Sequence, residues 1–111
     1  MKILTKEIET KLRANAKERK PAFEVKPVLK LFNPCGAATW LFTELDEDGD
    51  TLFGLCDLGM GYPEMGYASL SEIMSVRLPF GLKIERDMHF TASKSLQEYA
   101  DDANREGHIV A

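Results

Sequence analysis

Residues 38–58 read Ala38-Thr39-Trp40-Leu41-Phe42-Thr43-Glu44-Leu45, then Asp46-Glu47-Asp48-Gly49-Asp50, then Thr51-Leu52-Phe53-Gly54-Leu55-Cys56-Asp57-Leu58, and this stretch decides the fold. The first and third parts are rich in Thr, Leu and aromatic residues, which suit β-strands. The dipeptide Asp48-Gly49 between them is typical of a tight turn. The stretch therefore predicts a β-hairpin with arms at 38–45 and 51–58.

The first arm of this hairpin is largely apolar on both sides. Because strand side chains alternate, we expect Trp40, Phe42 and Glu44 on one face and Leu41, Thr43 and Leu45 on the other. Such a strand lies in the middle of a sheet, covered on both faces or on one face and a pocket. In the second arm, Gly54 indicates a bulge or close packing over Trp40.

The segments outside the hairpin carry their own helix and strand signals. Residues 1–21 predict a basic N-terminal helix, capped by Thr5 and ended by Pro21. Residues 26–90 form the predicted sheet core, with further strands at 28–32, 64–68 and 83–90 and a short helix at 69–77 that starts with the capping box Ser69/Glu72. A second capping box, Ser95/Glu98, starts a C-terminal helix at 95–106.

Together these elements predict one α+β domain over residues 1–111, built on an antiparallel sheet of about four to five strands with an N-terminal, a middle and a C-terminal helix. The composition is that of an ordinary globular protein, with 44% hydrophobic and 29% charged residues. Neither a membrane-spanning run nor a secretory signal is expected, so no membrane contact is predicted.

The two cysteines favour a cytoplasmic location. Cys35 and Cys56 form no Cys-x-x-Cys pair, and two cysteines in a chain of this size fit a reducing compartment. Cys56 lies inside a predicted strand and is expected to be a buried thiol rather than a nucleophile. No nucleophile motif is found, and His108 lies in a tail that is expected to be mobile.

Charge is unevenly distributed along the chain. Residues 1–30 hold nine Lys or Arg against four Glu, which is a net charge of +5. Residues 31–111 carry a net charge of −9, so the whole chain carries −4. A basic helix can contact nucleic acid, and the residues predicted for this role are Lys11, Arg13, Lys17, Arg19 and Lys20. The alternative is a solvated helix face with unevenly spread charges, which the pattern favours.

The predicted strand 83–90 places Glu85, Asp87 and His89 on one face. Two carboxylates beside an imidazole can bind a metal or move a proton, with Glu44 or Asp57 from neighbouring strands completing the site. However, positions i and i+4 on a strand are about 13 Å apart and positions i and i+2 about 7 Å apart. An open or ion-paired sheet surface is therefore favoured, and neither a metal nor a cofactor is predicted.

Arg86 lies on the opposite, apolar face of the same predicted strand, beside Ile84 and Met88. A guanidinium group in such a place needs a partner, and the favoured prediction is an ion pair with Glu44, Asp57 or Glu72. If Arg86 lined a cleft instead, it would suit an anionic ligand.

A further candidate surface surrounds the glycine-rich segment after the hairpin. Four apolar side chains are close together there in the sequence, and they are Met60, Tyr62, Met65 and Tyr67. Core packing is the ordinary role of such residues, whereas exposure would make them a protein-binding patch. Together with the acidic hairpin tip, 46–50, they form the predicted partner-binding surface. A calcium loop at the tip is disfavoured, because helices do not flank it.

Several sequence blocks resemble a known family. They are Lys30-Leu31-Phe32-Asn33-Pro34, Trp40-Leu41-Phe42-Thr43-Glu44-Leu45-Asp46, Phe53-Gly54-Leu55-Cys56-Asp57, residues 64–72 and residues 81–90. In this order, over about residues 28–90, they resemble the bacterial domain-of-unknown-function family numbered 2958. Members are often found on plasmids, phages and integrative elements. The resemblance implies a mobile-element origin and a single-domain fold, and it supplies no catalytic residue.

We therefore expect a small cytosolic accessory protein of a bacterial mobile element that binds a macromolecular partner, an unidentified host or element protein. The lack of a strong catalytic motif favours this hypothesis over an enzyme. The first alternative is a metal-binding protein or hydrolase-like enzyme using the residues of strand 83–90. The second is nucleic-acid contact through the basic N-terminal helix. The sequence leaves the oligomeric state open.

Overall fold

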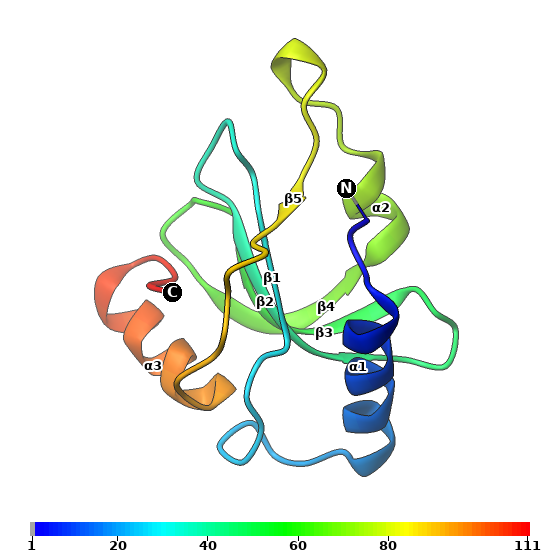
Figure 1. The fold of residues 1–111 in the computed structure, drawn as a ribbon. Helices are drawn as coiled ribbons and strands as arrows, with labels where there is room; N and C mark the ends of the chain where they lie inside the picture. The colour runs from blue at the N-terminus through cyan, green and yellow to red at the C-terminus, as the bar shows by residue number, and fades with distance from the viewer. Residues whose placement is uncertain (1) are drawn as a thin grey trace.

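A five-stranded antiparallel sheet forms the centre of the computed structural model, which describes residues 2–111 (Figure 1). The strands lie in the order β4-β3-β2-β1-β5, so β4 and β5 are the two edges. Their bounds are β1 Leu29–Phe32, β2 Thr39–Leu45, β3 Thr51–Asp57, β4 Glu64–Ser69 and β5 Glu85–Arg86. The predicted α+β class and the order of helices and strands are confirmed.

Within the described residues, three α-helices and one short 3-10 turn complete the fold. Their bounds are α1 Lys6–Glu18, α2 Leu70–Ser75, η1 Pro79–Gly81 and α3 Leu96–Glu106. The helices α1 and α2 are shorter than the predicted ranges 1–21 and 69–77, and Met1 lies outside the described residues. The Ser95/Glu98 capping box is confirmed, and Gly107 ends α3 in a left-handed conformation (φ 81°). At α2, Ser69 accepts a hydrogen bond from the Glu72 amide.

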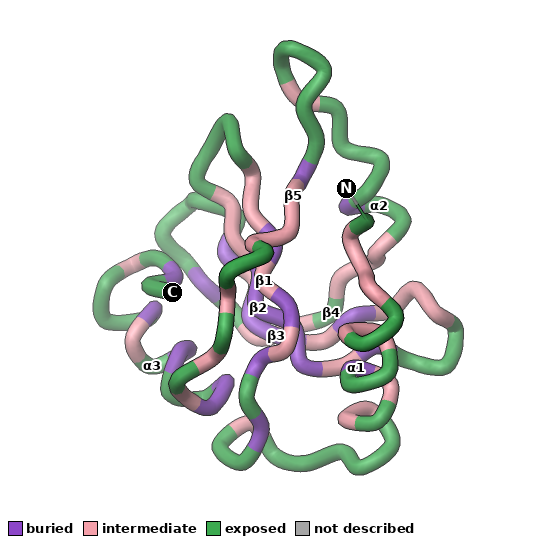
Figure 2. The backbone as a smooth tube through the Cα atoms, in the orientation of Figure 1, coloured by how far each residue is buried: buried purple, intermediate pink, exposed green. Residues whose placement is uncertain are grey.

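The sheet separates two hydrophobic cores. Leu12 of α1 and Ile73 of α2 pack with Trp40 and Phe42 on one face, whereas Leu96, Tyr99 and Ala100 of α3 pack with Leu41 and Leu55 on the other. Figure 1 shows α1 and α3 on opposite sides of the sheet, and Figure 2 shows the buried residues concentrated on the central strands. The expectation that the first hairpin arm is central and covered on both faces is confirmed.

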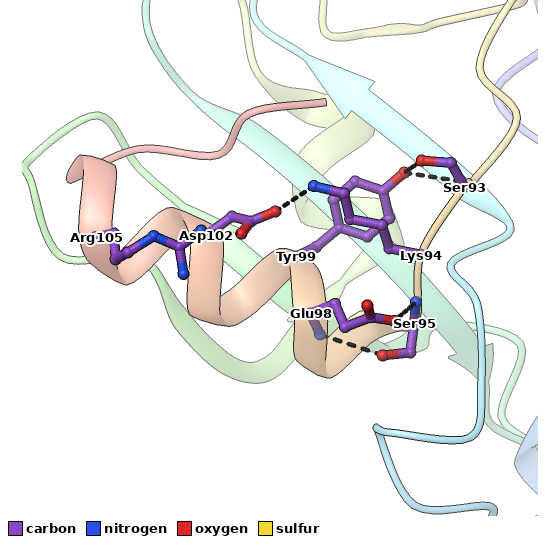
Figure 3. A network of polar contacts seen from close by, with 7 residues as sticks. All are labelled: Ser93, Lys94, Ser95, Glu98, Tyr99, Asp102 and Arg105. Carbon is purple, nitrogen blue, oxygen red and sulfur yellow. Dashed lines mark hydrogen bonds and ion pairs between the residues drawn. The ribbon is translucent and has the colours of Figure 1, made fainter.

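A polar network fixes α3 against the segment that precedes it (Figure 3). The Tyr99 hydroxyl accepts a hydrogen bond from the Ser93 amide at 3.0 Å. The Lys94 ammonium group lies over the Tyr99 ring and pairs with Asp102, which also pairs with Arg105. Hydrogen bonds from these two cations lower the pKa of the Asp102 carboxyl group. Polar contacts thus hold α3 to the segment that precedes it, and apolar contacts hold it to the second face of the sheet.

A β-bulge at Thr43 changes the face on which the next residues lie. Phe42 pairs with Gly54, but Glu44 already pairs with Phe53, so one residue of β2 has no counterpart on β3. Leu45 therefore joins the core under α1, and Glu44 lies on the α3 side of the sheet with Phe53. The predicted alternation, with Glu44 beside Trp40 and Leu45 beside Leu41, is wrong beyond the bulge.

The bulge is supported from both sides. The Thr43 carbonyl oxygen accepts a hydrogen bond from the Asn15 side chain of α1 at 3.0 Å. Across the hairpin, a Cβ atom added at Gly54 would lie on the Leu41 carbonyl oxygen and only 2.7 Å from the Phe42 Cα. Gly54 thus marks a bulge, as predicted, but the close approach is to the backbone of β2 and not to Trp40.

The strand predicted at 83–90 is wrong in length, because β5 contains only Glu85 and Arg86. After one more ladder hydrogen bond, from the Asp87 amide to the Lys30 carbonyl oxygen, the chain turns away. The Asp87 side chain accepts a hydrogen bond from the His89 amide at 2.9 Å, and the Asp87 carbonyl accepts one from the Phe90 amide. This aspartate-centred turn ends the strand, because it uses the backbone groups that a longer ladder would need.

The end of the chain is anchored, contrary to the expected mobile tail. Ile109 is buried, and its amide donates a hydrogen bond to the Asp57 carboxylate at 2.9 Å. The Lys30 ammonium group donates another to the Ala111 carbonyl oxygen at 2.7 Å. His108 itself is exposed between these anchors. Within residues 2–111, the helices are all too short or too polar to cross a membrane.

We expect Gly54→Ala to lower the free energy of unfolding by about 1–3 kcal/mol, because the new methyl group has no space beside the bulge. Urea denaturation measures the change. Gly66→Ala is the matched control: Gly66 is the β4 partner of Gly54, and no atom lies within 4 Å of its added Cβ. The control should stay within about 0.5 kcal/mol of the wild type. Equal stability of the two variants would contradict the close approach.

Candidate functional site

The structure does not bring the predicted carboxylate and histidine residues together. Glu85 is on β5, Asp87 and His89 belong to the turn that follows it, and Glu44 is on β2. Asp57 is fully buried at the end of β3, where its two oxygens accept hydrogen bonds from the Gly59 and Ile109 amides. Over residues 2–111, no group of three or more His, Cys, Asp or Glu side chains is placed to hold a metal ion.

Asp87 has a structural role in its turn. The hydrogen bond from the His89 amide, followed by the interaction with Lys30, lowers the pKa of its carboxyl group. The Lys30 ammonium group lies 3.4 Å from the carboxylate. Asp87 thus stays ionised and holds the chain reversal, and it does not orient the exposed His89 ring as a base.

Arg86 does not form the predicted ion pair with Glu44, Asp57 or Glu72. Its guanidinium group donates a hydrogen bond to the Ile3 carbonyl oxygen at 3.3 Å, which ties the segment before α1 to the edge of the sheet. Arg86 also lines a shallow pocket of about 280 Å³ between the start of α1 and β1. Glu7 and Lys11 line the same pocket and pair with each other at 3.6 Å.

Three of the five basic residues predicted to contact nucleic acid pair with acids of the same molecule. Lys11 pairs with Glu7, Arg13 with Glu9 at 2.9 Å, and Lys20 with Glu18 at 3.2 Å; all three pairs are at or near the surface. Arg13 also lies against the hairpin tip and donates a hydrogen bond to the Asp46 carbonyl oxygen at 3.5 Å. Lys17 and Arg19 are exposed at the end of the helix. This internal pairing weakens the case for a nucleic-acid interface on α1.

The acidic hairpin tip also organises its own backbone. Asp48 accepts hydrogen bonds from the Asp50 and Thr51 amides, each at 2.8 Å, and from the Thr51 hydroxyl. Asp50 accepts hydrogen bonds from the Ser69 hydroxyl and the Ser71 amide and so caps the start of α2. These hydrogen bonds lower the pKa of both carboxyl groups. The tip is a structural turn that joins the hairpin to α2.

The predicted cluster of Met60, Tyr62, Met65 and Tyr67 is divided in the structure. Met60 and Tyr62 are exposed in the loop between β3 and β4, at the end of β3 away from the hairpin tip. Met65 is half-buried against the core under α3. Tyr67 lies nearer the tip, paired across the strands with Phe53. The predicted surface made of this cluster and the acidic tip therefore does not exist as one patch.

A different group of residues converges on the α3 side of the sheet. Glu44, Phe53 and Tyr67 form one row across β2, β3 and β4, since Glu44 pairs with Phe53 and Phe53 with Tyr67. The Phe53 and Tyr67 ring centroids are 5.0 Å apart, and Tyr67 is 75% exposed. The row lines an open cleft of about 240 Å³, here called the Glu44 cleft, whose lining residues are Ala16, Arg19, Glu44, Asp46, Thr51, Phe53 and Tyr67.

The charged residues of the Glu44 cleft are two acids, Glu44 and Asp46, and one arginine, Arg19. Partial burial raises the pKa of the Glu44 carboxyl group, the nearby Arg19 opposes this shift, and Asp46 adds to it. Arg19 follows α1 in a left-handed conformation (φ 51°, ψ 47°), with its amide bonded to the Asn15 carbonyl oxygen. An aromatic pair beside a guanidinium group suits binding of a side chain or peptide, because aromatic residues and arginine are enriched in protein interfaces.

Sequence reasoning missed this site for a definite reason. The sequence predicts three separate roles for Glu44, Arg19 and Tyr67: a carboxylate site, nucleic-acid contact and partner binding. Only the bulge places Glu44 on the face of Phe53 and Tyr67, and Gly54 was the one sequence signal for it.

The comparisons with known proteins give a family and no activity. A family model described as "Protein of unknown function (DUF2958)" matches residues 3–110. No curated protein and no solved structure matches the chain. The match extends beyond the blocks at 28–90 to both α1 and α3, and it includes every residue of the Glu44 cleft.

We expect Glu44→Gln to raise the free energy of unfolding at pH 7. Because the folded-state pKa of Glu44 lies above 4.5, folding favours the protonated form. The stability that the protonated Glu44 contributes is fully present below pH 4.5 and is lost as the pH rises through the folded-state pKa. The extra free energy of unfolding of Glu44→Gln should therefore vanish below about pH 4. Urea denaturation at both pH values tests this.

The control for this experiment is Glu47→Gln on the exposed hairpin tip, which should stay within about 0.5 kcal/mol of the wild type. A destabilised Glu44→Gln protein at pH 7 would show that the electrostatic attraction of the Glu44 carboxylate to Arg19 outweighs the cost of its partial burial.

The two thiols should differ in reactivity. Cys35 is exposed, whereas burial raises the pKa of Cys56 to about 11. Relative to the ordinary value of 9.0, this leaves Cys56 with about a hundredfold less thiolate. A thiol reagent at pH 8 should therefore modify one cysteine per chain quickly, and Cys35→Ser should remove that fast phase. A fast phase that survives in Cys35→Ser would contradict the burial of Cys56.

Proposed function

The chain belongs to the DUF2958 family, and we propose that it is a binding protein whose Glu44 cleft and β4 edge receive a segment of a partner protein. The observation that carries the proposal is the Phe53/Tyr67 pair, left open on a sheet face that α3 covers only in part. A tyrosine that is 75% exposed and held by a neighbouring ring is a preformed contact, because little side-chain freedom remains to be lost on binding.

The edge strand beside this pair supports the same function. β4 is six residues long and lies at the end of the strand order, so one side of its backbone has no partner strand within the described residues. Natural proteins block such edges with lysine, proline or bulges, yet Glu64 is the only charged residue of β4 and Pro63 only precedes it. An extended partner segment can add to this edge through backbone hydrogen bonds, with a side chain in the Glu44 cleft.

The charges of the cleft favour one kind of partner side chain. Glu44 and Asp46 lie beside the aromatic pair, and Arg19 is the only basic residue in the lining. A partner lysine or arginine next to an apolar residue would complement this arrangement through an ion pair and a cation–π contact. Arg19 would then orient the segment by repelling the wrong register.

The cellular setting is a separate part of the proposal. We place the protein in the bacterial cytoplasm as an accessory protein of a mobile element; the support is the family resemblance and the two free cysteines. A hydrolase or metal protein using Glu85, Asp87 and His89 has less support, because these residues are separated. Nucleic-acid binding through α1 has less support, because Lys11, Arg13 and Lys20 pair with acids of the same molecule.

A photo-crosslinking amino acid in place of Tyr67 tests the proposal in cells that carry the natural partner. We expect it to capture one protein, and peptides of that protein should bind the purified chain. Tyr67→Ala should then weaken binding about tenfold or more, as expected for the loss of an aromatic contact at an interface centre.

Phe23 is the matched control position. It is exposed in the segment between α1 and β1, so a crosslinker there should not capture the same protein. Circular dichroism should show Tyr67→Ala to be folded. Identical capture from positions 67 and 23, or unchanged affinity of a folded Tyr67→Ala protein, would rule out the proposed surface.

A further inference from the structure

The loop between α2 and β5 projects from the body of the molecule, above the N-terminal segment in Figure 1. Two backbone hydrogen bonds close it, from the Leu78 amide to the Leu82 carbonyl at 3.0 Å and from the Leu82 amide to the Pro79 carbonyl at 3.2 Å. Phe80 stands at its tip and is 97% exposed. The loop is therefore a turn closed by hydrogen bonds, with the Phe80 ring exposed to solvent. Figure 2 shows most of the loop coloured as exposed.

The turn itself gives no reason for a phenylalanine. Phe80 has φ 61° and ψ 25°, and Gly81 follows with φ 73°, so both central residues are left-handed. Such turns favour Gly, Asn or Asp, because a Cβ atom is strained in this region. Phe80 is thus unfavourable both for the backbone and for solvation, which points to a function for the exposed ring.

An apolar groove lies at the base of the same loop. Ile3, Met74, Leu82 and Ile84 supply its apolar lining, and its volume is about 370 Å³. A cavity of about 150 Å³ is enough to bind benzene, so the groove has room for a phenyl ring. The ring of the same chain does not occupy it, because Phe80 is almost completely exposed.

We propose that two copies of this chain form a reciprocal dimer in which Phe80 of each copy enters the groove of the other. The Phe80 tip and the apolar groove are adjacent in one chain. A single two-fold axis can therefore place each Phe80 ring in the groove of the other copy. Charge supports this occupant: Arg77 precedes the loop tip, while Glu72 on α2 and Glu85 in the groove lining, where Lys83 also lies, can receive it from the partner copy.

An anionic membrane is a less favoured partner for the exposed Phe80 ring, because the chain has a net charge of −4. The dimer goes beyond the proposed partner binding and does not depend on it. It uses the β5 side of the sheet and leaves β4, at the opposite edge, free. Two β4 edges in one dimer would bind a repeated partner segment with avidity.

Sedimentation velocity of the purified chain over about a hundredfold range of concentration tests the dimer. We expect reversible, concentration-dependent dimerisation. Phe80→Gly should weaken it about thirtyfold or more, since it removes the ring at the interface centre. The same change should keep or raise the melting temperature, because glycine suits the left-handed conformation. Phe23→Ala, at an exposed phenylalanine outside the loop, should leave dimerisation unchanged.

A mixing experiment distinguishes the reciprocal arrangement from other dimers. Met74→Lys places a charge in the groove and should abolish self-association, as Phe80→Gly does. A mixture of the two variants should recover weak dimers, because the intact tip of the Met74→Lys chain can enter the intact groove of the Phe80→Gly chain. Met74 is half-exposed, so both variants are expected to fold, and circular dichroism verifies it.

Three results would overturn the proposal. One is a monomer at every concentration, and the second is a Phe80→Gly protein that dimerises like the wild type. The third is a monomeric chain that co-sediments with phosphatidylglycerol vesicles only when Phe80 is present, which would assign the tip to a membrane. None of these results bears on capture at Tyr67, so the two proposals fail independently.

Discussion

The bulge at Thr43 is the constraint on which the arrangement of the molecule depends. It forms where the β2 backbone approaches Gly54 so closely that a side chain would not fit. The carbonyl group that the bulge removes from the ladder bonds to Asn15, so the bulge also fixes α1 on its face of the sheet. One extra residue thereby places Leu45 in the core under α1 and Glu44 in an open cleft on the other face. Neither position is possible in a regular hairpin.

Charge in this protein acts mainly within the chain. The basic first segment and the acidic remainder meet where α1 packs on β2, with Arg13 against the hairpin tip. The acids of the tip bind their own backbone and the start of α2. The uneven charge of the sequence thus serves the assembly of helix, hairpin and helix more than the attraction of a distant partner. Arg19 and Glu44 lie in the Glu44 cleft beside the half-buried Phe53 and the exposed Tyr67.

The sequence predicted the fold class, the hairpin, the helix order and the Ser95/Glu98 capping box, because local patterns determine these features. It did not predict the site. Glu44 and Tyr67 are 23 positions apart and meet only through the register of β2 on β3 and β3 on β4. The alternating pattern of residues 83–90 predicted too long a strand for a similar reason, because Asp87 can continue a strand or start a turn. The tertiary hydrogen bonds around Lys30 select the turn. Residues that form a site through long-range register carry no local signal of it.

The two edge strands of the sheet differ in how well their backbones are protected from a further strand, and this difference argues for distinct roles. β5 is only two residues long and ends in an aspartate-centred turn, and its residue Arg86 is bonded to Ile3, so little backbone is open there. Short, turned edges of this kind resist addition of further strands. β4 has none of these protections over its six residues. If exposure of β4 were merely tolerated, an apolar tyrosine beside it would add a risk of aggregation without benefit. A protein that closes one edge and leaves aromatic residues at the other has the features expected of a surface that is covered in use.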